Sequence, residues 1–414
     1  MSLALVAAPS LARETAAGPT TFAAAPARPD HDRARMNQRV FDKVWSEVRT
    51  QYYDPHLHGV DWNAARRTWR PQALAATDDR VLYRVLDQML NLLDDDHAGA
   101  SPPAVARRID TLRERRPAMG VVLRRDDADP DVYLVETVRA GSPAEEAGVA
   151  EGWKLQTGAP GAWFPEMDVV AGQAVTLSFL DDAGAAHQTV VTPRMLEPQP
   201  AFVADRSRPG VAVLRIEGFE PGLGRWMGDQ LSQLDANADV VIDLRGNPGG
   251  RLMEADAVLS CFLPPDRLWA TRTARSGQRA LLRTAGGCGD LRRPVSNPIA
   301  ILVDGNSRSA AELTPAALQE AGRALVVGEP TAGAVLISQE TRLPDGGRLT
   351  LSRADFVTSG GVRLEKRGVT PDVFAEGSSA DRRAGRDPVL DAAIAALAAR
   401  TAGERVLAIE TAPL

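Results

Sequence analysis

The segment from Val303 to Glu312 places a serine where it could act as a nucleophile. An apolar run ends at Val303, small turn-forming residues follow, and a helical pattern begins after Ser309. A serine at such a junction can point into a cleft, and N–H groups at the start of the helix can stabilise a developing oxyanion. Ser307 is the competing nucleophile, and both serines could instead serve only to form the turn.

A second segment, from Asp243 to Gly250, reads D-L-R-G-N-P-G-G at the end of an apolar strand. Its glycines let the backbone approach a ligand and direct N–H groups at it. Taken alone, this segment is equally typical of a tight turn between a strand and a helix. Neither segment contains a residue that could deprotonate Ser309.

The elements around these two segments follow an α/β pattern. Short apolar runs that predict strands alternate with helical stretches, then a hairpin turns at Asp345-Gly346-Gly347 and a helix closes the chain. The predicted strands are Val211–Ile216, Val240–Leu244, Ile299–Val303 and Ala324–Val327, the hairpin covers Gln339–Val357, and the closing helix covers Pro388–Ala399.

The N-terminal part has a different organisation. Apolar residues at helical spacing predict helices over 36–53 and 81–93, and this helical region ends at Asp94-Asp95-Asp96-His97. Between about residues 118 and 193, short apolar runs alternate with turns, and Gly141 to Val149 reads as a turn into a short helix. That order resembles a PDZ domain, although Trp153 stands where the family usually has an acidic residue.

Together, the two chemical segments resemble tail-specific, or C-terminal processing, serine peptidases of the tricorn-like S41 family. The family core carries D-x-R-x-N-x-G-G and a Ser/Ala-rich turn that ends in Glu. Val60-Asp61-Trp62 resembles its helical cap, and Gly368 to Asp372 matches G-V-x-P-D. The resemblance implies a multidomain α/β fold with an N-terminal helical cap, a PDZ-like β-rich insertion and a crotonase-like (ClpP-like) protease core. The expected divisions are 1–33 (leader), 34–105 (cap), 106–200 (PDZ-like), 201–380 (core) and 381–414 (C-terminal helix and tail).

The resemblance also implies site residues. Ser309 corresponds to the nucleophile, and Gly249 or Gly250, with Ala310, would supply oxyanion-hole N–H groups. Many family members use a lysine as the base, but Ala334 occupies that position here. The chain has three lysines, of which Lys43 and Lys154 belong to other domains and Lys366 lies beside a glutamate that would keep it protonated. Replacing Lys366 by alanine is therefore expected to leave activity intact.

Tricorn-type members resemble a Ser-His-Glu arrangement instead, and His97 and Glu365 occupy the matching positions. Histidine titrates near neutrality, so it suits a general base, and a carboxylate can orient its ring. His97 could also end a helix or bind a metal adventitiously, and Glu365 could belong to a solvated charge cluster. Glu320 is the other carboxylate that could support the base. In the PDZ-like part, Met119, Gly120 and Val121 would form the loop that binds a peptide carboxylate, unless that domain is only a lid.

Composition limits partners and compartment. There are 48 basic and 54 acidic residues, a net charge of −6 and no long basic run, which argues against a nucleic-acid surface. No metal or cofactor is expected, oligomerisation is left open, and no run of about 18 apolar residues predicts a membrane span. Met1 to Ala12 resembles part of an export signal, which favours a periplasmic or secreted protein. Cys261 and Cys288 could pair in an oxidising compartment or remain free thiols.

The sequence therefore predicts a serine endopeptidase that hydrolyses peptides or unfolded protein tails through an acyl-enzyme on Ser309. The alternative is a catalytically inactive family member that binds peptides or apolar ligands. The missing lysine and Asp96, which replaces the family's serine before His97, motivate this alternative.

Overall fold

The computed structural model describes residues 31–110, 114–125, 132–156 and 169–410. The predicted export-type segment Met1 to Ala12 and most of the predicted leader lie outside the described residues. The first helix, α1, begins at His31, a few residues before the point where folding was expected to start.

A six-stranded sheet forms the centre of the core. Its strands lie in the order β18-β15-β14-β11-β10-β9, and every neighbouring pair is parallel except β9 with β10. Parallel strands are covered on both faces, which explains their continuous apolar runs. The four predicted core strands are confirmed. The strands are β9 (Phe202–Asp205), β10 (Val211–Ile216), β11 (Asp239–Asp243), β14 (Ile299–Val303), β15 (Leu325–Gly328) and β18 (Val373–Phe374).

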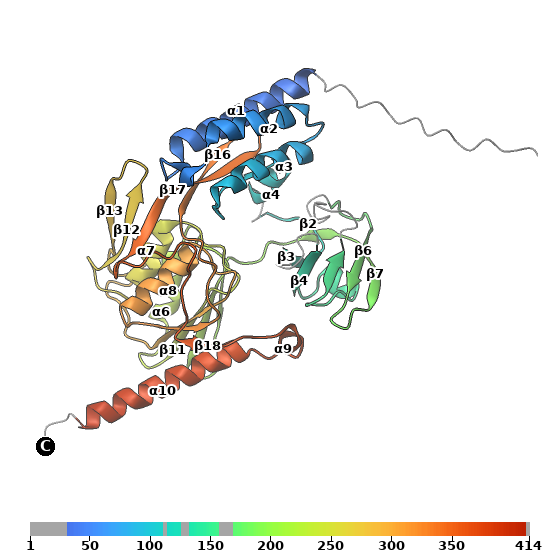
Figure 1. The fold of residues 1–414 in the computed structure, drawn as a ribbon. Helices are drawn as coiled ribbons and strands as arrows, with labels where there is room; N and C mark the ends of the chain where they lie inside the picture. The colour runs from blue at the N-terminus through green and yellow to red at the C-terminus, as the bar shows by residue number, and fades with distance from the viewer. Residues whose placement is uncertain (1–30, 111–113, 126–131, 157–168, 411–414) are drawn as a thin grey trace, which may run out of the picture.

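Helices cover both faces of this sheet. The helices α6 (Leu223–Ser232), α7 (Leu252–Ser260) and α8 (Ala310–Glu320) pack on one face, and α10 (Pro388–Glu410) runs along the other (Figure 1). A disulfide joins Cys261, just after α7, to Cys288, so the structure resolves the pairing that the sequence left open.

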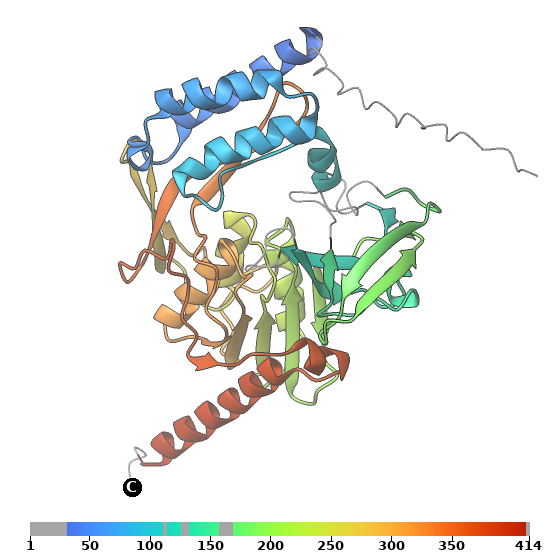
Figure 2. The ribbon, with the colours of Figure 1, turned by 45° about the vertical axis from the view of Figure 1, so that its right-hand side comes forward.

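The N-terminal helices pack on a hairpin that belongs to the C-terminal half of the chain (Figures 1 and 2). Their buried core includes Leu343, Leu349 and Leu351 of that hairpin. The helices are α1 (His31–Gln51), α2 (Trp62–Ala75) and α3 (Asp79–Leu90), with short turns η1 (Leu57–Gly59) and η2 (Asn91–Leu93). The hairpin strands are β16 (Ile337–Arg342) and β17 (Arg348–Thr358).

A second sheet extends this hairpin in the order β1-β17-β12-β13, with β16 also paired to β17. The short strand β1 (Gly99–Ser101) follows directly after the helical cap, and its Gly99 lies opposite Thr350 of β17. The hairpin formed by β12 (Leu268–Ala274) and β13 (Arg279–Arg283) was not predicted from the sequence.

A separate five-stranded sheet, in the order β3-β4-β5-β6-β7, lies beside the core (Figure 2). Trp153 stacks on His187 with ring centroids 4.4 Å apart. Arg382 in α9 (Ser379–Arg383) donates to Glu151 Oε2 at 3.1 Å, which ties this sheet to the core. The elements of this region are α4 (Pro103–Asp110), β2 (Arg116–Ala118), β3 (Val121–Arg125), β4 (Val132–Val138), α5 (Pro143–Glu146), β5 (Lys154–Gln156), β6 (Val175–Leu180), β7 (Ala186–Val191) and β8 (Arg194–Leu196).

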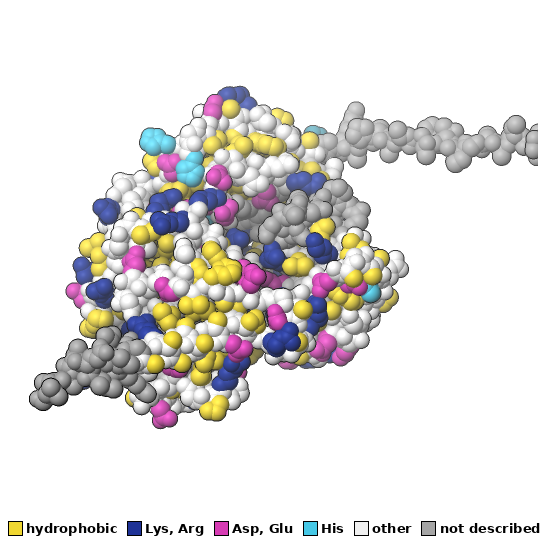
Figure 3. Space-filling view, turned by 60° about the horizontal axis from the view of Figure 1, so that its bottom comes forward, with side chains coloured by type: hydrophobic (Ala, Val, Ile, Leu, Met, Phe, Trp, Pro, Cys, Tyr) yellow, Lys and Arg dark blue, Asp and Glu magenta, His cyan; other side chains and the backbone are white. Residues whose placement is uncertain are grey.

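Acidic and basic side chains are interspersed on the face shown in Figure 3. This matches the mixed charge of the sequence. Within the described ranges, no helix combines the length and apolar character that crossing a membrane requires.

Candidate active site

Ser309 occupies the position directly before α8, with φ 54° and ψ −117°. A positive φ is strained for a residue with a Cβ atom, and such strain is maintained only where surrounding contacts impose it. Here the Ser309 N–H donates to the carbonyl of Ala334 at 2.8 Å and to Glu312 Oε2 at 3.1 Å. The predicted strand-turn-helix junction is therefore present, and its serine is held in a defined, strained conformation.

Ser307, the competing nucleophile, has a structural role. Its side chain is fully buried, its hydroxyl donates to the carbonyl of Leu244 at 2.9 Å, and it accepts from the N–H of Asp304 at 3.0 Å. These bonds join the turn before Ser309 to the end of β11. Ser309, by contrast, is only partly buried.

The glycine turn after β11 lies directly against Ser309. A Cβ atom on Gly249, which has φ 95°, would come within 2.7 Å of the Ser309 Cβ and 3.0 Å of the Ala310 nitrogen. A Cβ atom on Gly250 would come within 2.4 Å of the Phe219 carbonyl oxygen. The turn therefore needs glycine at both positions for backbone to pack this closely.

Of these two glycines, only one has an N–H without a partner. The Gly249 N–H donates to Asn247 Oδ1 at 2.8 Å. The N–H groups of Gly250 and Ala310 have no hydrogen-bond partner in the described part of the chain. Two unpaired donors thus flank Ser309, and the Ala310 donor lies at the positive end of the α8 dipole.

The remaining polar residues of D-L-R-G-N hold the turn in place. Arg245 donates to both carboxylate oxygens of Asp243 and to Asp387 at the start of α10. Burial alone would lower the pKa of Arg245, but the bonds to the two carboxylates outweigh it and raise that pKa. The Asn247 side chain donates to the Ile216 carbonyl at 2.7 Å.

Glu312 fixes the other side of the serine turn. Its buried carboxylate accepts four hydrogen bonds, from the hydroxyl of Thr331 and from the N–H groups of Gly333, Ala334 and Ser309. Burial raises the pKa of Glu312, although all four donors act in the opposite direction. Sequence reasoning treated Glu312 only as the end of a motif. Its place three residues after a helix-capping serine was the signal for this role.

His97 lies in the loop between η2 and β1. The Asp95 carboxylate, itself buried, accepts the His97 N–H at 2.8 Å. The His97 Nε2 atom is buried and has no hydrogen-bond partner within the described ranges. Because β1 pairs with β17 two residues later, the loop is anchored to the core sheet.

Glu365 lies against the serine turn from the opposite side. It is 7% exposed, and its Oε2 accepts the Val335 N–H at 2.9 Å. Burial is the main cause that raises the pKa of Glu365. The Val335 bond and the charge of His97 oppose the rise, while the charge of Asp95 adds to it. His97 and Asp95 are therefore close enough to Glu365 to act on it electrostatically.

One peptide group connects the serine and the glutamate. The Ala334 carbonyl accepts from the Ser309 N–H, and the N–H of the same peptide group, on Val335, donates to Glu365. In the described residues, no hydrogen bond joins any two of the Ser309, His97 and Glu365 side chains. The arrangement offers a serine, two N–H donors, a histidine and a buried carboxylate, which are the groups that acyl transfer requires.

Comparison with known proteins identifies the family. The model of peptidase family S41 matches residues 210–375, which include the glycine turn and Ser309, and the model of the tricorn protease C1 domain matches residues 34–91. The core of the chain matches peptidase family S41. It is a serine peptidase, as the sequence predicted, and the family core holds both chemical segments.

Relatives match most of this S41 chain. It is 26% identical to a carboxyl-terminal-processing protease of Synechocystis sp., over 82% of this chain and 81% of that protein. It is 24% identical to the carboxy-terminal processing protease CtpA of Bacillus subtilis, over 72% of this chain and 65% of that protein. The solved photosystem II D1 C-terminal processing protease has the same fold, with a TM-score of 0.60 at 23% identity, over 82% of this chain and 93% of that one.

In this S41 peptidase the site lacks a lysine beside Ser309. Ala334, at the position of the family's lysine, is buried and uses its carbonyl to accept the Ser309 N–H. Lys366 donates to Asp96 and Asp94. Burial alone would lower the pKa of Lys366, but these two carboxylates outweigh it and raise that pKa, so the amine is protonated at neutral pH.

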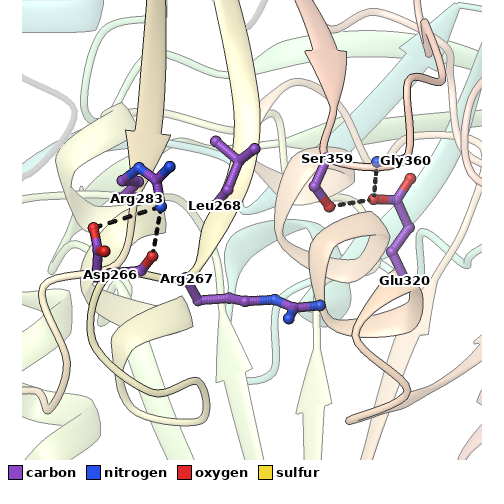
Figure 4. Close-up of a pocket in the computed structure, with 7 residues that line it drawn as sticks. All are labelled: Asp266, Arg267, Leu268, Arg283, Glu320, Ser359 and Gly360. Atoms are coloured by element: carbon purple, nitrogen blue, oxygen red, sulfur yellow. Dashed lines mark hydrogen bonds and ion pairs between the residues drawn. The ribbon is translucent and has the colours of Figure 1, made fainter.

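Glu320, the other carboxylate that could support the base, makes its hydrogen bonds at a different place. It accepts from the hydroxyls of Thr358 and Ser359 and from the Gly360 N–H, at the C-terminal end of α8 (Figure 4). In the same view the Arg267 side chain extends towards it across a surface pocket. Glu365 is a carboxylate on which the charge of His97 acts.

Proposed function

We propose that this S41 peptidase is an endopeptidase of the C-terminal processing type, with Ser309 as nucleophile, His97 as general base and Glu365 as the carboxylate that orients His97. The observation that carries the proposal is the single peptide group between Ala334 and Val335 that joins Ser309 to Glu365. Since the charge of His97 acts on Glu365, the histidine belongs to the same cluster.

The chemistry follows from these positions. The Ser309 hydroxyl oxygen attacks the peptide carbonyl carbon while its proton moves to His97, and the carbonyl oxygen becomes negatively charged. His97 then gives the proton to the leaving amine, the C–N bond breaks, and an acyl-enzyme ester remains. Water, deprotonated by His97, hydrolyses the ester. Catalytic hydrogen bonds are often long without substrate and shorten in the substrate complex, which fits the unpaired Nε2 of His97.

The oxyanion would be held by two backbone donors. The sequence left open whether Gly249 or Gly250 supplies the first donor, but the Gly249 N–H already donates to Asn247. The unpaired N–H groups of Gly250 and Ala310 support these two residues as the oxyanion hole. Two such donors in a water-poor site stabilise the tetrahedral intermediate by several kcal/mol, on the order of 3 kcal/mol each.

We place the substrate in a groove of about 260 Å³ between the five-stranded sheet and the core. Gly120 and Val121 line it on the side of a domain that we regard as PDZ-like, and Glu217 lines it on the core side. Glu217 precedes Phe219 by two residues, and Phe219 bridges to Gly250, so an extended peptide in the groove would point towards the oxyanion donors. The Met119 side chain is buried in the domain core, which limits it to a supporting role.

The predicted domain divisions, 34–105, 106–200 and 201–380, fit this arrangement and are retained as part of the proposal. The disulfide between Cys261 and Cys288 supports a periplasmic or secreted location, because such bonds persist in oxidising compartments. A catalytically silent binding protein is not favoured, because Ser309, His97 and Glu365 are all residue types suited to acyl transfer and relatives are named as proteases.

Peptide hydrolysis by the Ser309→Ala variant tests the proposal. Removing the nucleophile is expected to lower the rate of hydrolysis of an unstructured peptide by roughly 10⁴-fold or more. Ser232→Ala is the matched control, since it removes an exposed hydroxyl at the end of α6 that the mechanism does not use. Unchanged hydrolysis by Ser309→Ala, with wild-type protein active, would rule out this serine as the nucleophile.

A further inference from the structure

Lys366 makes contacts that the proposed chemistry does not use. Its Nζ atom donates to Asp96 Oδ2 at 3.0 Å and to Asp94 Oδ1 at 3.3 Å. These two aspartates flank Asp95, whose carboxylate accepts the His97 N–H. A lysine of the core thus holds both ends of the short segment directly before the proposed base.

The core end of this contact is rigidly placed. Lys366 follows Glu365 and has a left-handed backbone, with φ 60°. Its N–H donates to the Gly333 carbonyl at 2.7 Å, and Glu365 accepts from Val335, so both residues are bonded to the turn that also binds Ser309 and Glu312. The Lys366 backbone is therefore fixed relative to the serine.

The cap end of the contact is anchored to the core by β1, which pairs with β17 from Gly99 onwards. In the described part of the chain, the backbone hydrogen bonds of residues 94–98 are local, to Asn91 and within Asp95-Ala98, and the Tyr52 hydroxyl of the cap lies near the Asp95 carboxylate. The buried Nε2 of His97 has no partner. The position of the imidazole therefore depends on how its loop is held: β1 fixes the loop on one side, and on the other side Lys366 is, among the described residues, a core side chain bonded to it.

We propose that Lys366 is a positioning residue: its ammonium group clasps Asp94 and Asp96 and so places His97 against Glu365 and Ser309. This inference rests on the proposed function, in which His97 is the base. It replaces the expectation from sequence that Lys366→Ala would leave activity intact. Where other family members use a lysine as base, this chain uses one to place a histidine.

The side chains are open to solvent to different degrees, with 40% of Lys366, 48% of Asp96 and 87% of Asp94 exposed. Ion pairs of this kind contribute little to global stability, about 1 kcal/mol or less. A displacement of a catalytic group by a fraction of an ångström to an ångström, however, lowers turnover by roughly 10 to 100-fold. A positioning role for Lys366 therefore predicts that its removal lowers kcat strongly and lowers the melting temperature only slightly.

The test compares kcat and KM of wild type, Lys366→Met and Lys366→Arg on one peptide. Lys366→Met is expected to lower kcat by at least about tenfold with KM changed by less than about twofold, and Lys366→Arg is expected to restore most of the loss. Arginine can bind both carboxylates but cannot act as a base, because it stays protonated. Lys43→Met, which removes the ion pair with Glu47 elsewhere in the cap, is the matched control and should behave as wild type.

Equal kcat in Lys366→Met and wild type would overturn the proposed positioning role of Lys366. Equal loss in the methionine and arginine variants would overturn it as well, because lysine itself would then be needed. If Lys366→Met does not fold, the double variant Asp94→Asn/Asp96→Asn carries the same test and the same expected loss. Failure of the proposed function is distinguishable, since wild type would then hydrolyse no peptide or Ser309→Ala would remain active.

Discussion

Among single residues, the two buried glutamates of the site, Glu312 and Glu365, have different proposed roles. Glu312 accepts four hydrogen bonds and holds the turn around Ser309, whereas Glu365 accepts one from the backbone and lies within the electrostatic reach of His97. A carboxylate with unused acceptor capacity beside a histidine is suited to orient the ring and stabilise its cation. The number of bonded donors thus separates the structural glutamate from the proposed catalytic one.

This assignment predicts that Glu365→Gln lowers peptide hydrolysis and raises the stability of the fold at pH 8. The raised pKa of Glu365 means that the folded protein binds this proton more tightly than the unfolded chain does. Its contribution to stability is complete below the unfolded pKa, near 4.5, and is lost as pH rises through the higher folded pKa. Glutamine removes that loss and keeps an acceptor for Val335.

Urea unfolding at pH 4 and pH 8 checks the prediction. The stability of Glu365→Gln relative to wild type should be greater at pH 8 than at pH 4, while peptide hydrolysis should fall by roughly 100-fold or more. A variant with wild-type turnover would show that Glu365 does not support the base. A relative stability independent of pH would show that Glu365 is not buried as a charged group.

At the scale of elements, the site depends on close contact between two turns. The glycine turn after β11 and the serine turn before α8 touch through Gly249, where any Cβ atom would collide with Ser309. Gly246 is in the same turn and also has a positive φ, of 70°, but a Cβ atom there would meet no atom within 4 Å. Substitution of Gly249 therefore tests both contact with the site and backbone strain, whereas substitution of Gly246 tests backbone strain alone.

Gly249→Ala is expected to lower turnover by roughly 100-fold, because the added methyl group displaces Ser309 or the donor of Ala310. Gly246→Ala is the control: the left-handed backbone should destabilise it by about 1 to 2 kcal/mol, with activity retained. Peptide hydrolysis and thermal unfolding of both variants provide the comparison. Equal activity in the two variants would contradict close contact as the reason for Gly249.

Sequence patterns predicted these elements well where burial alone determines them. The apolar runs of β10, β11, β14 and β15 and the hairpin of β16 and β17 are present as predicted. The hairpin of β12 and β13 was missed because neither strand alternates buried and exposed residues: β12 buries three consecutive residues, Trp269 to Thr271, and β13 buries none. Charge pattern alone also could not show that Lys366 contacts Asp94 and Asp96, since these residues are distant in sequence.

At the scale of the whole molecule, the site is divided between the cap and the core. The helical cap packs on the hairpin of β16 and β17, and β1 joins the cap to the same sheet, so the loop that carries His97 is joined to the C-terminal half of the chain, which carries Ser309. Motif positions could nominate Ser309, His97 and Glu365. Their arrangement needed the fold, because it depends on pairing between strands far apart in sequence.

The central claim is that His97, from the cap, activates Ser309, from the core. The most direct measurement is the rate at which a fluorophosphonate probe labels Ser309 in folded wild-type and His97→Ala protein, with the modified residue located by mass spectrometry of peptides. Wild type is expected to be labelled at Ser309, and His97→Ala is expected to lose roughly 10⁴-fold in rate, in effect showing no labelling. Labelling of Ser309 in His97→Ala at the wild-type rate would contradict it.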